Sequence, residues 1–391
     1  MYYRSFEFDS PTRIKYGIGI VESVGEEVRK FGAKKVLIVA DRGVVEAGLV
    51  DKVREFLKPS KAKALIFDEV EPNPKDKTVE KGVVLACEEK VDLIIGVGGG
   101  SSMDTAKAIS LLVTNGGSIR DYQGIDKVKN PLLPLIVIPT TAGTGSEVSP
   151  WLIIDDTSRV PYIKLDVCSR LICPRVTLAD PLMTKNLPPR LTASIGMDGL
   201  TSAIEAYTSP VASPLTDVLS LHSIKLIANN LQKAFANGDD LEARANMMLG
   251  SLMAGVAFFN SSCGGVHGMS EAVGGFYDTP HGISCAIFLP YVMEYNLIAN
   301  PKKYADIAQA MGENITGLST REASVKSVEA VKNLMKEIGI PSPQQVGVKE
   351  TDIPQLAKIA LAGSDTKDNP RKLTQGDLMN IFKRAMKGEL A

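Results

Sequence analysis

The first 185 residues alternate short β-branched runs with amphipathic segments. The runs KVLIVA, ALIF, DLIIGVGGG and LIVIP occupy residues 35–40, 64–67, 92–100 and 135–139. Segments with helical periodicity follow the first three runs, at residues 44–57, 76–90 and 102–113. Buried strands that alternate with helices at this spacing predict βαβ units and a parallel sheet with helices on both faces. We therefore expect the N-terminal part to be an α/β, Rossmann-like domain.

The pattern changes to long helical periodicity after Pro188. Segments such as 213–235 and 240–259 are amphipathic or apolar over many turns, and the rest of the chain has hardly a strand candidate. The proline pair in LPPRLT, at residues 187–192, is typical of a helix start. A chain of 391 residues also exceeds the usual size of one core. The sequence predicts an α/β domain at 1–185 and an all-α domain at 186–391.

Composition excludes several classes of protein. The net charge is −1, and no long run of like charges indicates nucleic acid or an anionic membrane as a partner. The N-terminus lacks the apolar core of a signal peptide, and the most apolar run is short and cut by prolines. Five cysteines form no CxxC pair, which favours reduced thiols. We expect a cytoplasmic enzyme.

A glycine-rich turn after the third run is a candidate dinucleotide site. Gly98, Gly99 and Gly100 end a predicted strand and begin a predicted helix, where bare backbone and the helix N-terminus can hold a pyrophosphate. The turn lacks the spaced GxGxxG pattern, so a purely structural turn is an equal alternative. The next strand ends in a second polar loop, TTAGTGSEVS, which strengthens the nucleotide interpretation. The candidate residues of these two loops are Gly98, Gly99, Gly100, Ser101, Ser102, Asp104, Thr140, Thr141, Thr144 and Ser146.

Asp41 ends the first predicted strand. A carboxylate at such a position accepts hydrogen bonds from an adenosine ribose and repels a 2′-phosphate, which favours NAD over NADP. An ordinary acidic loop residue is the alternative.

Histidine is scarce, and its placement indicates a metal. Two of the three histidines, His267 and His281, bracket a glycine-rich segment, and Asp198 lies in the helical segment GMDGLTSAIEAY. Imidazole and carboxylate are common ligands of catalytic divalent cations. We predict that Asp198, His267 and His281 hold one such ion, and that His222, in an amphipathic segment, is structural. Cys263 precedes His267 by four residues and either faces the same site or fills the core.

Six motifs in order along nearly the whole chain resemble the iron-containing (group III) alcohol dehydrogenase family. They are GGGSSMDTAK, PTTAGTGSEVS, DPLMTKNLPP, GMDGLTSAIEAYTSPVASPLTD, VHGMSEAVGGFYDTPHGISCAIFLP and NPRKLTQGDL. The resemblance implies a nucleotide-binding domain, a helical domain, and a metal with a nicotinamide cofactor. It puts Asp198, His267 and His281 on family metal ligands, and the glycine-rich loops, Asp41 and Asn73 at the cofactor. It also implies a homodimer or a higher homo-oligomer.

The chain departs from the family pattern at two positions. Family members usually carry a histidine one helical turn after the aspartate, where this chain has Ser202, and a second histidine near the nicotinamide, where it has Glu271. Three outcomes stay open. Asp198, His267 and His281 form a three-ligand site, as in the related glycerol dehydrogenases, or Glu271 joins as a fourth ligand, or the metal is weak or absent, as in maleylacetate reductases.

We interpret the chain as an NAD(P)-dependent alcohol dehydrogenase or aldehyde reductase with Fe²⁺ or Zn²⁺. It would transfer a hydride between nicotinamide, NAD rather than NADP, and a small alcohol or carbonyl held by the metal. Glu271 is the candidate for proton relay or substrate orientation. One alternative is a lyase or synthase on the same scaffold, similar to dehydroquinate synthase, although few basic residues lie near the proposed ligands. Another is a nucleotide-binding protein that has lost catalysis.

Overall fold

The computed structural model describes residues 5–160 and 162–390, which form two compact units. One unit comprises residues 10–187, and the other comprises residues 188–390 together with 5–9. The boundary lies two residues beyond the one we placed after residue 185. We did not anticipate that residues 5–9 join the helical unit. Two hydrogen bonds hold them there. The Asp9 N–H donates to Asn260 Oδ1 at 2.7 Å, and Asn260 Nδ2 donates to the Asp9 carbonyl at 2.9 Å.

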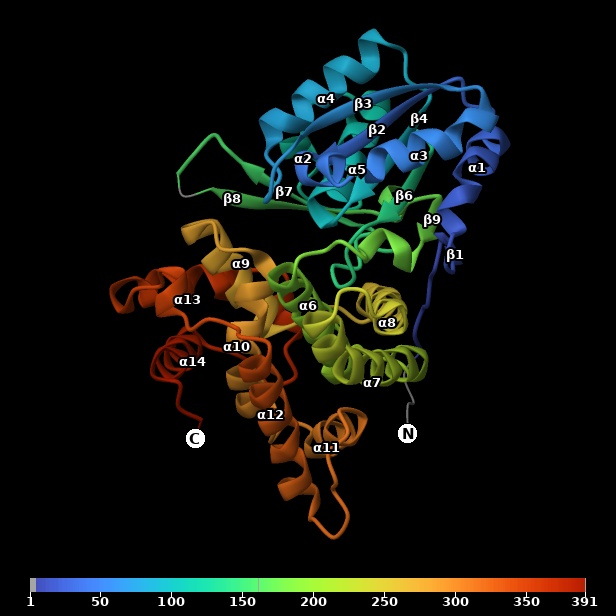
Figure 1. The fold of residues 1–391 in the computed structure, drawn as a ribbon. Helices are drawn as coiled ribbons and strands as arrows, with labels where there is room; N and C mark the ends of the chain where they lie inside the picture. Colours follow the sequence, from blue (N-terminus) through green and yellow to red (C-terminus); the bar gives the residue numbers. More distant parts are fainter. Residues whose placement is uncertain (1–4, 161, 391) are drawn as a thin grey trace. The chain divides into compact units, whose positions relative to one another are not determined.

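The unit at residues 10–187 is built on a six-stranded parallel sheet (Figure 1). Its strands, in spatial order, are β1 (Arg13–Tyr16), β9 (Val176–Ala179), β6 (Leu135–Pro139), β4 (Leu93–Gly98), β2 (Lys35–Asp41) and β3 (Lys63–Val70). Each adjacent pair is parallel, which confirms the predicted α/β class. The short strands β1 and β9 were not predicted.

Helices cover both faces of this sheet, as the alternation of apolar runs predicted. They are α1 (Val24–Lys30), α2 (Arg42–Glu46), α3 (Leu49–Leu57), α4 (Asp76–Glu88) and α5 (Gly100–Asn115). Successive side chains of a strand point to opposite faces. Leu37 and Val39 of β2 accordingly join a core with residues of α4 and α5, while Val36 and Ile38 join a second core with residues of α1 and α3.

The connections between strands create a switch point at the carboxyl ends of β2 and β4. The chain leaves β2 through α2 and α3 toward β3 on one side, and leaves β4 through α5 toward β6 on the other. In open α/β sheets, ligands bind in the crevice at such a reversal. Asp41 ends β2 and Gly98 ends β4, so two candidate cofactor residues lie at this position.

A second, smaller sheet has strands on both sides of β6 in the sequence, and it was not predicted. It consists of β5 (Gly124–Ile125), β8 (Ile163–Cys168) and β7 (Trp151–Asp156), and β7 runs antiparallel to β8. The sequence prediction missed it because both strands of the pair carry charged residues that weaken the apolar pattern. Trp151 begins β7 at the edge of this sheet.

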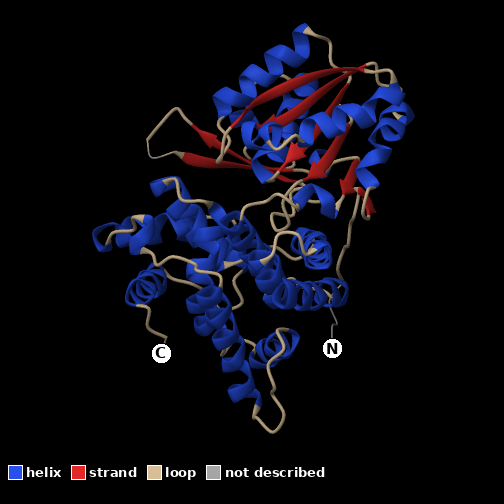
Figure 2. Cartoon of the chain, in the orientation of Figure 1, coloured by secondary structure: helices blue, strands red, loops and turns tan. Residues whose placement is uncertain are grey.

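The other unit is helical across its described residues, and Figure 2 shows every strand in the unit at 10–187. This confirms the predicted all-α half. Its helices are α6 (Pro189–Thr208), α7 (Pro214–Ala236), α8 (Leu241–Phe259), α9 (Gly265–Tyr277), α10 (His281–Asn296), α11 (Pro301–Ala310), α12 (Thr320–Glu337), α13 (Ile353–Ala362) and α14 (Gln375–Lys387). None of the described helices combines the length and apolarity that crossing a membrane requires.

Helix α6 packs against α7, α8 and α10 in the helical unit. It begins at Pro189, where proline suits the first helical position. From Thr192 to Thr208 nearly every side chain is buried, and the buried set includes Asp198, Ser202 and Glu205. Burial of such polar groups is costly unless they have partners or ligands. The helix therefore carries a polar site in an otherwise apolar interior.

A close approach between α10 and α6 positions His281. A Cβ atom added at Gly282 would lie 2.2 Å from the carbonyl oxygen of Ser194 in α6. Only glycine fits that contact without displacement of the backbone. His281 is the first residue of α10, so the same contact holds its ring beside α6.

Candidate metal and dinucleotide sites

The two glycine-rich loops of the α/β unit contact each other. Gly98 has φ +150°, and a Cβ atom there would lie 2.4 Å from Ser102 Oγ. Cβ atoms at Gly99 and Gly100 would lie 3.1 and 3.2 Å from the Cγ2 atoms of Thr141 and Thr144. The predicted neighbourhood of these loops is therefore present, and the absence of side chains there leaves backbone accessible to a ligand.

The start of α5 has the features of an anion site. Gly99 is its N-terminal cap residue, and no side chain caps the helix. The helix N-terminus offers N–H groups and the positive end of the dipole. Beside it, Thr141 Oγ1 is buried without a hydrogen-bond partner in the described structure. A pyrophosphate would supply acceptors for these donors, so the residues present fit a dinucleotide.

Asp41 connects the first strand to this turn. Its Oδ1 accepts a hydrogen bond from the Val44 N–H at 3.0 Å and so caps α2. Its Oδ2 accepts from Ser102 Oγ at 3.2 Å. The carboxylate is thus fixed next to the glycine turn, and Thr140 N–H donates to the Gly98 carbonyl at 3.0 Å from the neighbouring strand.

Asp104 and Ser146 take part in a buried network around Lys107, a residue that the sequence interpretation did not single out. The Lys107 ammonium group donates to Ser146 Oγ at 2.9 Å and to the Trp151 carbonyl at 2.6 Å. Asp104 accepts from Ser146 Oγ and from the Ile153 N–H, and it lies 3.7 Å from the Lys107 nitrogen. Burial raises the pKa of Asp104 and lowers that of Lys107. The network fixes the second loop against α5.

Asn73 adopts a left-handed backbone conformation, with φ +51°, in the segment after β3. Its Oδ1 accepts a hydrogen bond from Lys164 Nζ at 3.3 Å, and the same nitrogen lies 3.3 Å from Asp155 Oδ1. Asparagine tolerates positive φ better than most residues. Lys164 is thus a cation next to a predicted cofactor residue.

In the helical unit, Asp198, His267 and His281 converge, as predicted. Asp198 Oδ1 lies 3.8 Å from His267 Nε2 and 3.6 Å from His281 Nε2. Each histidine comes from a different helix, α9 or α10, and both helices contact each other. The structure adds Cys285, whose Sγ lies 3.5 Å from His281 Nε2, and the four ligand atoms all lie within 4.8 Å of one another.

The imidazole rings of His267 and His281 both direct Nε2 toward Asp198 Oδ1. Glu205 Oε2 lies 2.5 Å from His267 Nδ1, and it also accepts from the Gly264 N–H at 3.0 Å. Ser270 Oγ lies 3.2 Å from His281 Nδ1 and donates to the His281 carbonyl at 3.0 Å. A partner on Nδ1 leaves Nε2 available, which is the usual arrangement of metal-binding histidines.

The charge balance also fits a cation. Asp198 Oδ1 is buried and has no hydrogen-bond partner in the described structure. Burial raises the pKa of Asp198 to about 6, partly opposed by His267. An orphaned buried carboxylate oxygen is costly unless a cation neutralises it. Asp198, His267 and His281 therefore suit a divalent metal.

The remaining candidates take different places. Ser202 Oγ lies 3.5 Å from His267 Nε2, so it borders the cluster. Glu271 is not grouped with the ligand atoms among the described residues; its Oε2 would lie 3.7 Å from a Cβ atom at Gly363. His222 is exposed on α7. Cys263 forms a second group of neighbouring ligand atoms with Glu205 and His267.

Sequence reasoning missed Glu205 and Cys285. Glu205 follows Asp198 by seven residues and Cys285 follows His281 by four, so each lies on the same helix face as a predicted ligand. That spacing was the available signal.

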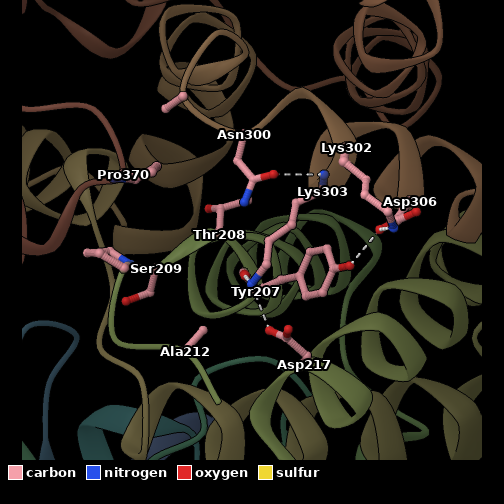
Figure 3. Close-up of a pocket in the computed structure, with 12 residues that line it drawn as sticks. Tyr207, Thr208, Ser209, Ala212, Asp217, Asn300, Lys302, Lys303, Asp306 and Pro370 are labelled. Carbon is pink, nitrogen blue, oxygen red and sulfur yellow. Dashed lines mark hydrogen bonds and ion pairs between the residues drawn. The ribbon is translucent and has the colours of Figure 1, made fainter. Parts of the chain in front are cut away.

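A separate pocket of the helical unit contains none of these candidates (Figure 3). In it, Lys303 Nζ lies 2.8 Å from Asp217 Oδ1 and 4.6 Å from the Tyr207 ring centroid, and Tyr207 OH donates to Asp306 Oδ2 at 2.9 Å. These groups satisfy one another, so the pocket gives no indication of a ligand.

The chain matches two family models. Residues 11–181 match "Iron-containing alcohol dehydrogenase", and residues 192–386 match "Fe-containing alcohol dehydrogenase family, C-terminal". It is 44% identical to 1,3-propanediol dehydrogenase from Klebsiella pneumoniae, over 98% of this chain and 100% of that protein. It is 42% identical to NAD-dependent methanol dehydrogenase from Bacillus methanolicus, over 97% and 99%. A solved 1,3-propanediol oxidoreductase superposes with a TM-score of 0.95 at 44% identity, covering 98% of this chain and 100% of that one.

Proposed function

The chain belongs to the iron-containing alcohol dehydrogenase family, and from this premise we propose that Asp198, His267 and His281 hold its catalytic divalent cation. The protein is an oxidoreductase that acts on alcohols and aldehydes with a nicotinamide cofactor. The observation that carries the ligand assignment is the buried, unpartnered Asp198 Oδ1 beside two histidine Nε2 atoms. It also argues against the metal-independent alternative.

The residues of the helical unit prepare this site. A bound divalent cation supplies Lewis acidity that favours the alkoxide form of an alcohol, and the nicotinamide accepts or returns the hydride. Asp198 provides negative charge, and Glu205 fixes the orientation and tautomer of His267 through Nδ1. Ser270 does the same for His281. Burial shields Asp198 and His267 from water, whereas the His281 side chain is 35% exposed.

The residues of the α/β unit bind the cofactor in this proposal. The N-terminus of α5 and the turn at Gly98, Gly99 and Gly100 receive the pyrophosphate, and Thr141 Oγ1 donates to it. Ser101, Thr140 and Thr144 line the same two loops. Asp41 accepts from the adenosine ribose hydroxyls and disfavours a 2′-phosphate, so we propose NAD rather than NADP. Asp104 and Ser146 act through the Lys107 network, and Asn73 acts with Lys164.

Glu271 has a proposed role in proton relay or substrate orientation. Its side chain is partly buried on α9, one helical turn after His267. Glu271→Gln should lower turnover and alter its pH profile. Unchanged turnover and profile would make Glu271 a structural residue.

The substrates we propose are small primary alcohols and diols, and the matching aldehydes. Relatives named for 1,3-propanediol, methanol and lactaldehyde support this class. We further propose that the protein is a homo-oligomer, since most soluble oligomers are symmetric assemblies of one chain. We also propose that it lies in the cytoplasm.

A turnover assay tests the proposal. Reduction of NAD⁺ is measured with a panel of short alcohols and diols, on protein depleted of metal and then supplied with Fe²⁺ or Zn²⁺. Turnover that requires the ion is expected. Absence of turnover with every alcohol and either ion would overturn the proposal and favour a synthase or a non-catalytic nucleotide-binding protein.

A further inference from the structure

We propose that Cys285 is a fourth protein ligand of the metal site and biases that site toward Zn²⁺ over Fe²⁺. This inference rests on the proposed metal site and adds a residue to it. The Ser202 hydroxyl lies at the border of the cluster, 3.5 Å from His267 Nε2. Because it is neutral, it is a poor metal ligand. A set of Asp198, His267 and His281 alone would leave one tetrahedral position without a strong donor.

The helix geometry directs Cys285 to this position. Cys285 follows His281 by one helical turn on α10, so both side chains leave the same face of the helix. The residue is fully buried, and its Sγ lies 3.5 Å from His281 Nε2. The face on which it lies is the one that contacts α6 and α9, which carry the other ligands.

The separations of the four ligand atoms are close to those that a tetrahedral metal site requires. In tetrahedral geometry, zinc bonds of about 2.0–2.1 Å to nitrogen or oxygen and about 2.3 Å to sulfur place nitrogen and oxygen ligands about 3.3–3.4 Å apart, and either of them about 3.5–3.6 Å from sulfur. The corresponding separations are 3.8 Å for Asp198 and His267, 3.6 Å for Asp198 and His281, and 3.5 Å for Cys285 and His281. Small side-chain adjustments suffice to place one ion among the four.

A second observation points to the same location. Among the described residues Asp198 Oδ1 is buried without a hydrogen-bond partner, and it belongs to the same cluster of ligand atoms as Cys285 Sγ. A cation at the centre of that cluster would neutralise it. Cys285 would bind as a thiolate, with its proton released to solvent, so that two anionic and two neutral ligands surround the ion.

The ligand chemistry determines the metal preference. A thiolate is a soft ligand that favours zinc, and the intrinsic order of affinities also places Fe²⁺ below Zn²⁺. Some catalytic zinc sites expand to five-coordinate, so a fourth protein ligand is compatible with substrate binding. We therefore expect Zn²⁺ to displace Fe²⁺ from this chain.

Cobalt substitution tests the ligand directly, without an activity measurement. The metal-depleted protein receives one equivalent of Co²⁺, and the sulfur-to-cobalt charge-transfer absorption is recorded in the near ultraviolet. The band should be present in the unsubstituted protein and in Cys263→Ser, and absent in Cys285→Ser. Cys285→Ser should also bind the ion at least about 10-fold more weakly, since loss of even an outer-shell partner costs 10–100-fold. Cys87→Ser, an exposed thiol in the other unit, is the matched control for adventitious binding.

The outcomes separate this inference from the proposed function. A band that persists in Cys285→Ser, or disappears only in Cys263→Ser, overturns the assignment while the metal site stands. Absence of Co²⁺ uptake by the unsubstituted protein overturns both. If Cys285→Ser does not fold, zinc X-ray absorption on the unsubstituted protein decides: one sulfur at about 2.3 Å supports the ligand, and nitrogen and oxygen neighbours alone reject it.

Discussion

Glu205 determines which nitrogen of His267 is available to a metal. Its carboxylate is buried and accepts from three groups, the His267 ring at Nδ1 and the N–H groups of Gly264 and Val266. A carboxylate is required because all three are donors, whereas an amide would present its own N–H₂ to one of them. The effect on catalysis is indirect, through the orientation of the ring.

Glu205→Gln should weaken divalent-metal binding about 10- to 100-fold, because one donor is left facing another donor and the ring loses its fixed tautomer. Competition with a chromogenic chelator measures the affinity. Glu242→Gln, an exposed change on α8, is the matched control and should leave it unaltered. Equal affinities for Glu205→Gln and the unsubstituted protein would show that Glu205 does not orient the ligand.

Asp41→Ser should shift cofactor preference toward NADP, because serine keeps an acceptor for the Val44 N–H but removes the charge. The ratio of kcat/KM for NADPH to that for NADH should rise about 10-fold or more. The free energy of such a change is smaller than the repulsion of roughly 4 kcal/mol between two like charges 4 Å apart near a protein surface. Asp51→Ser, exposed on α3, is the control. A ratio that does not move would remove Asp41 from ribose recognition.

At the scale of elements, the metal site depends on the approach of α10 to α6. His281 follows Pro280, which ends the preceding loop, and the next residue is Gly282 against the Ser194 carbonyl. Two helices meet here through backbone rather than through side chains. The position of the histidine is therefore sensitive to a single added carbon.

Gly282→Ala should lower the free energy of unfolding by about 1–3 kcal/mol, the usual cost of overpacking, and weaken metal binding as His281 moves away from Asp198. Chemical denaturation and metal titration measure the two effects. Gly376→Ala on α14, where an added Cβ has no neighbour closer than 3.7 Å, should leave both values nearly unchanged. Normal metal affinity in Gly282→Ala would show that the contact does not position the site.

The sequence was sufficient to predict the strands and helices that have a strong hydrophobic periodicity. The buried strands β2, β4 and β6 and helices such as α4 and α5 follow directly from apolar runs and amphipathic segments. The short strands β1 and β9 and the antiparallel pair β7 and β8 were missed, since tertiary pairing rather than local pattern determines them.

The residues of the candidate site also include some that the sequence predicted and some that it missed. Rare residue types and the family resemblance indicated Asp198, His267 and His281, which do converge. Cys285 and Glu205 were missed because their role depends on which helix faces meet. Lys107 was missed for the same reason, since its partners come from a loop about 40 residues further along the chain.

At the scale of the whole molecule, the proposed metal and dinucleotide sites belong to different units. The proposed metal ligands all lie at 188–390, and the proposed dinucleotide-binding residues all lie at 10–187. Each ligand stabilises the residues that it contacts, because it binds the folded form preferentially.

Hydrogen exchange should therefore separate the two sites. Zn²⁺ added to metal-free protein should slow amide exchange in α6, α9 and α10, whereas NADH should slow it in the turns that follow β2, β4 and β6. Mass spectrometry of proteolytic fragments resolves the segments. NADH protection confined to the helical unit would contradict the proposed cofactor site.

The metal content of the purified protein, measured by elemental analysis together with turnover before and after chelation, tests most directly whether Asp198, His267 and His281 hold a catalytic ion. We predict close to one equivalent of divalent cation in the unsubstituted protein, loss of turnover when a chelator removes it, and little bound metal in His267→Ala and His281→Ala. Less than about a tenth of an equivalent in protein that retains full turnover after chelation would contradict the claim that these side chains hold a catalytic ion.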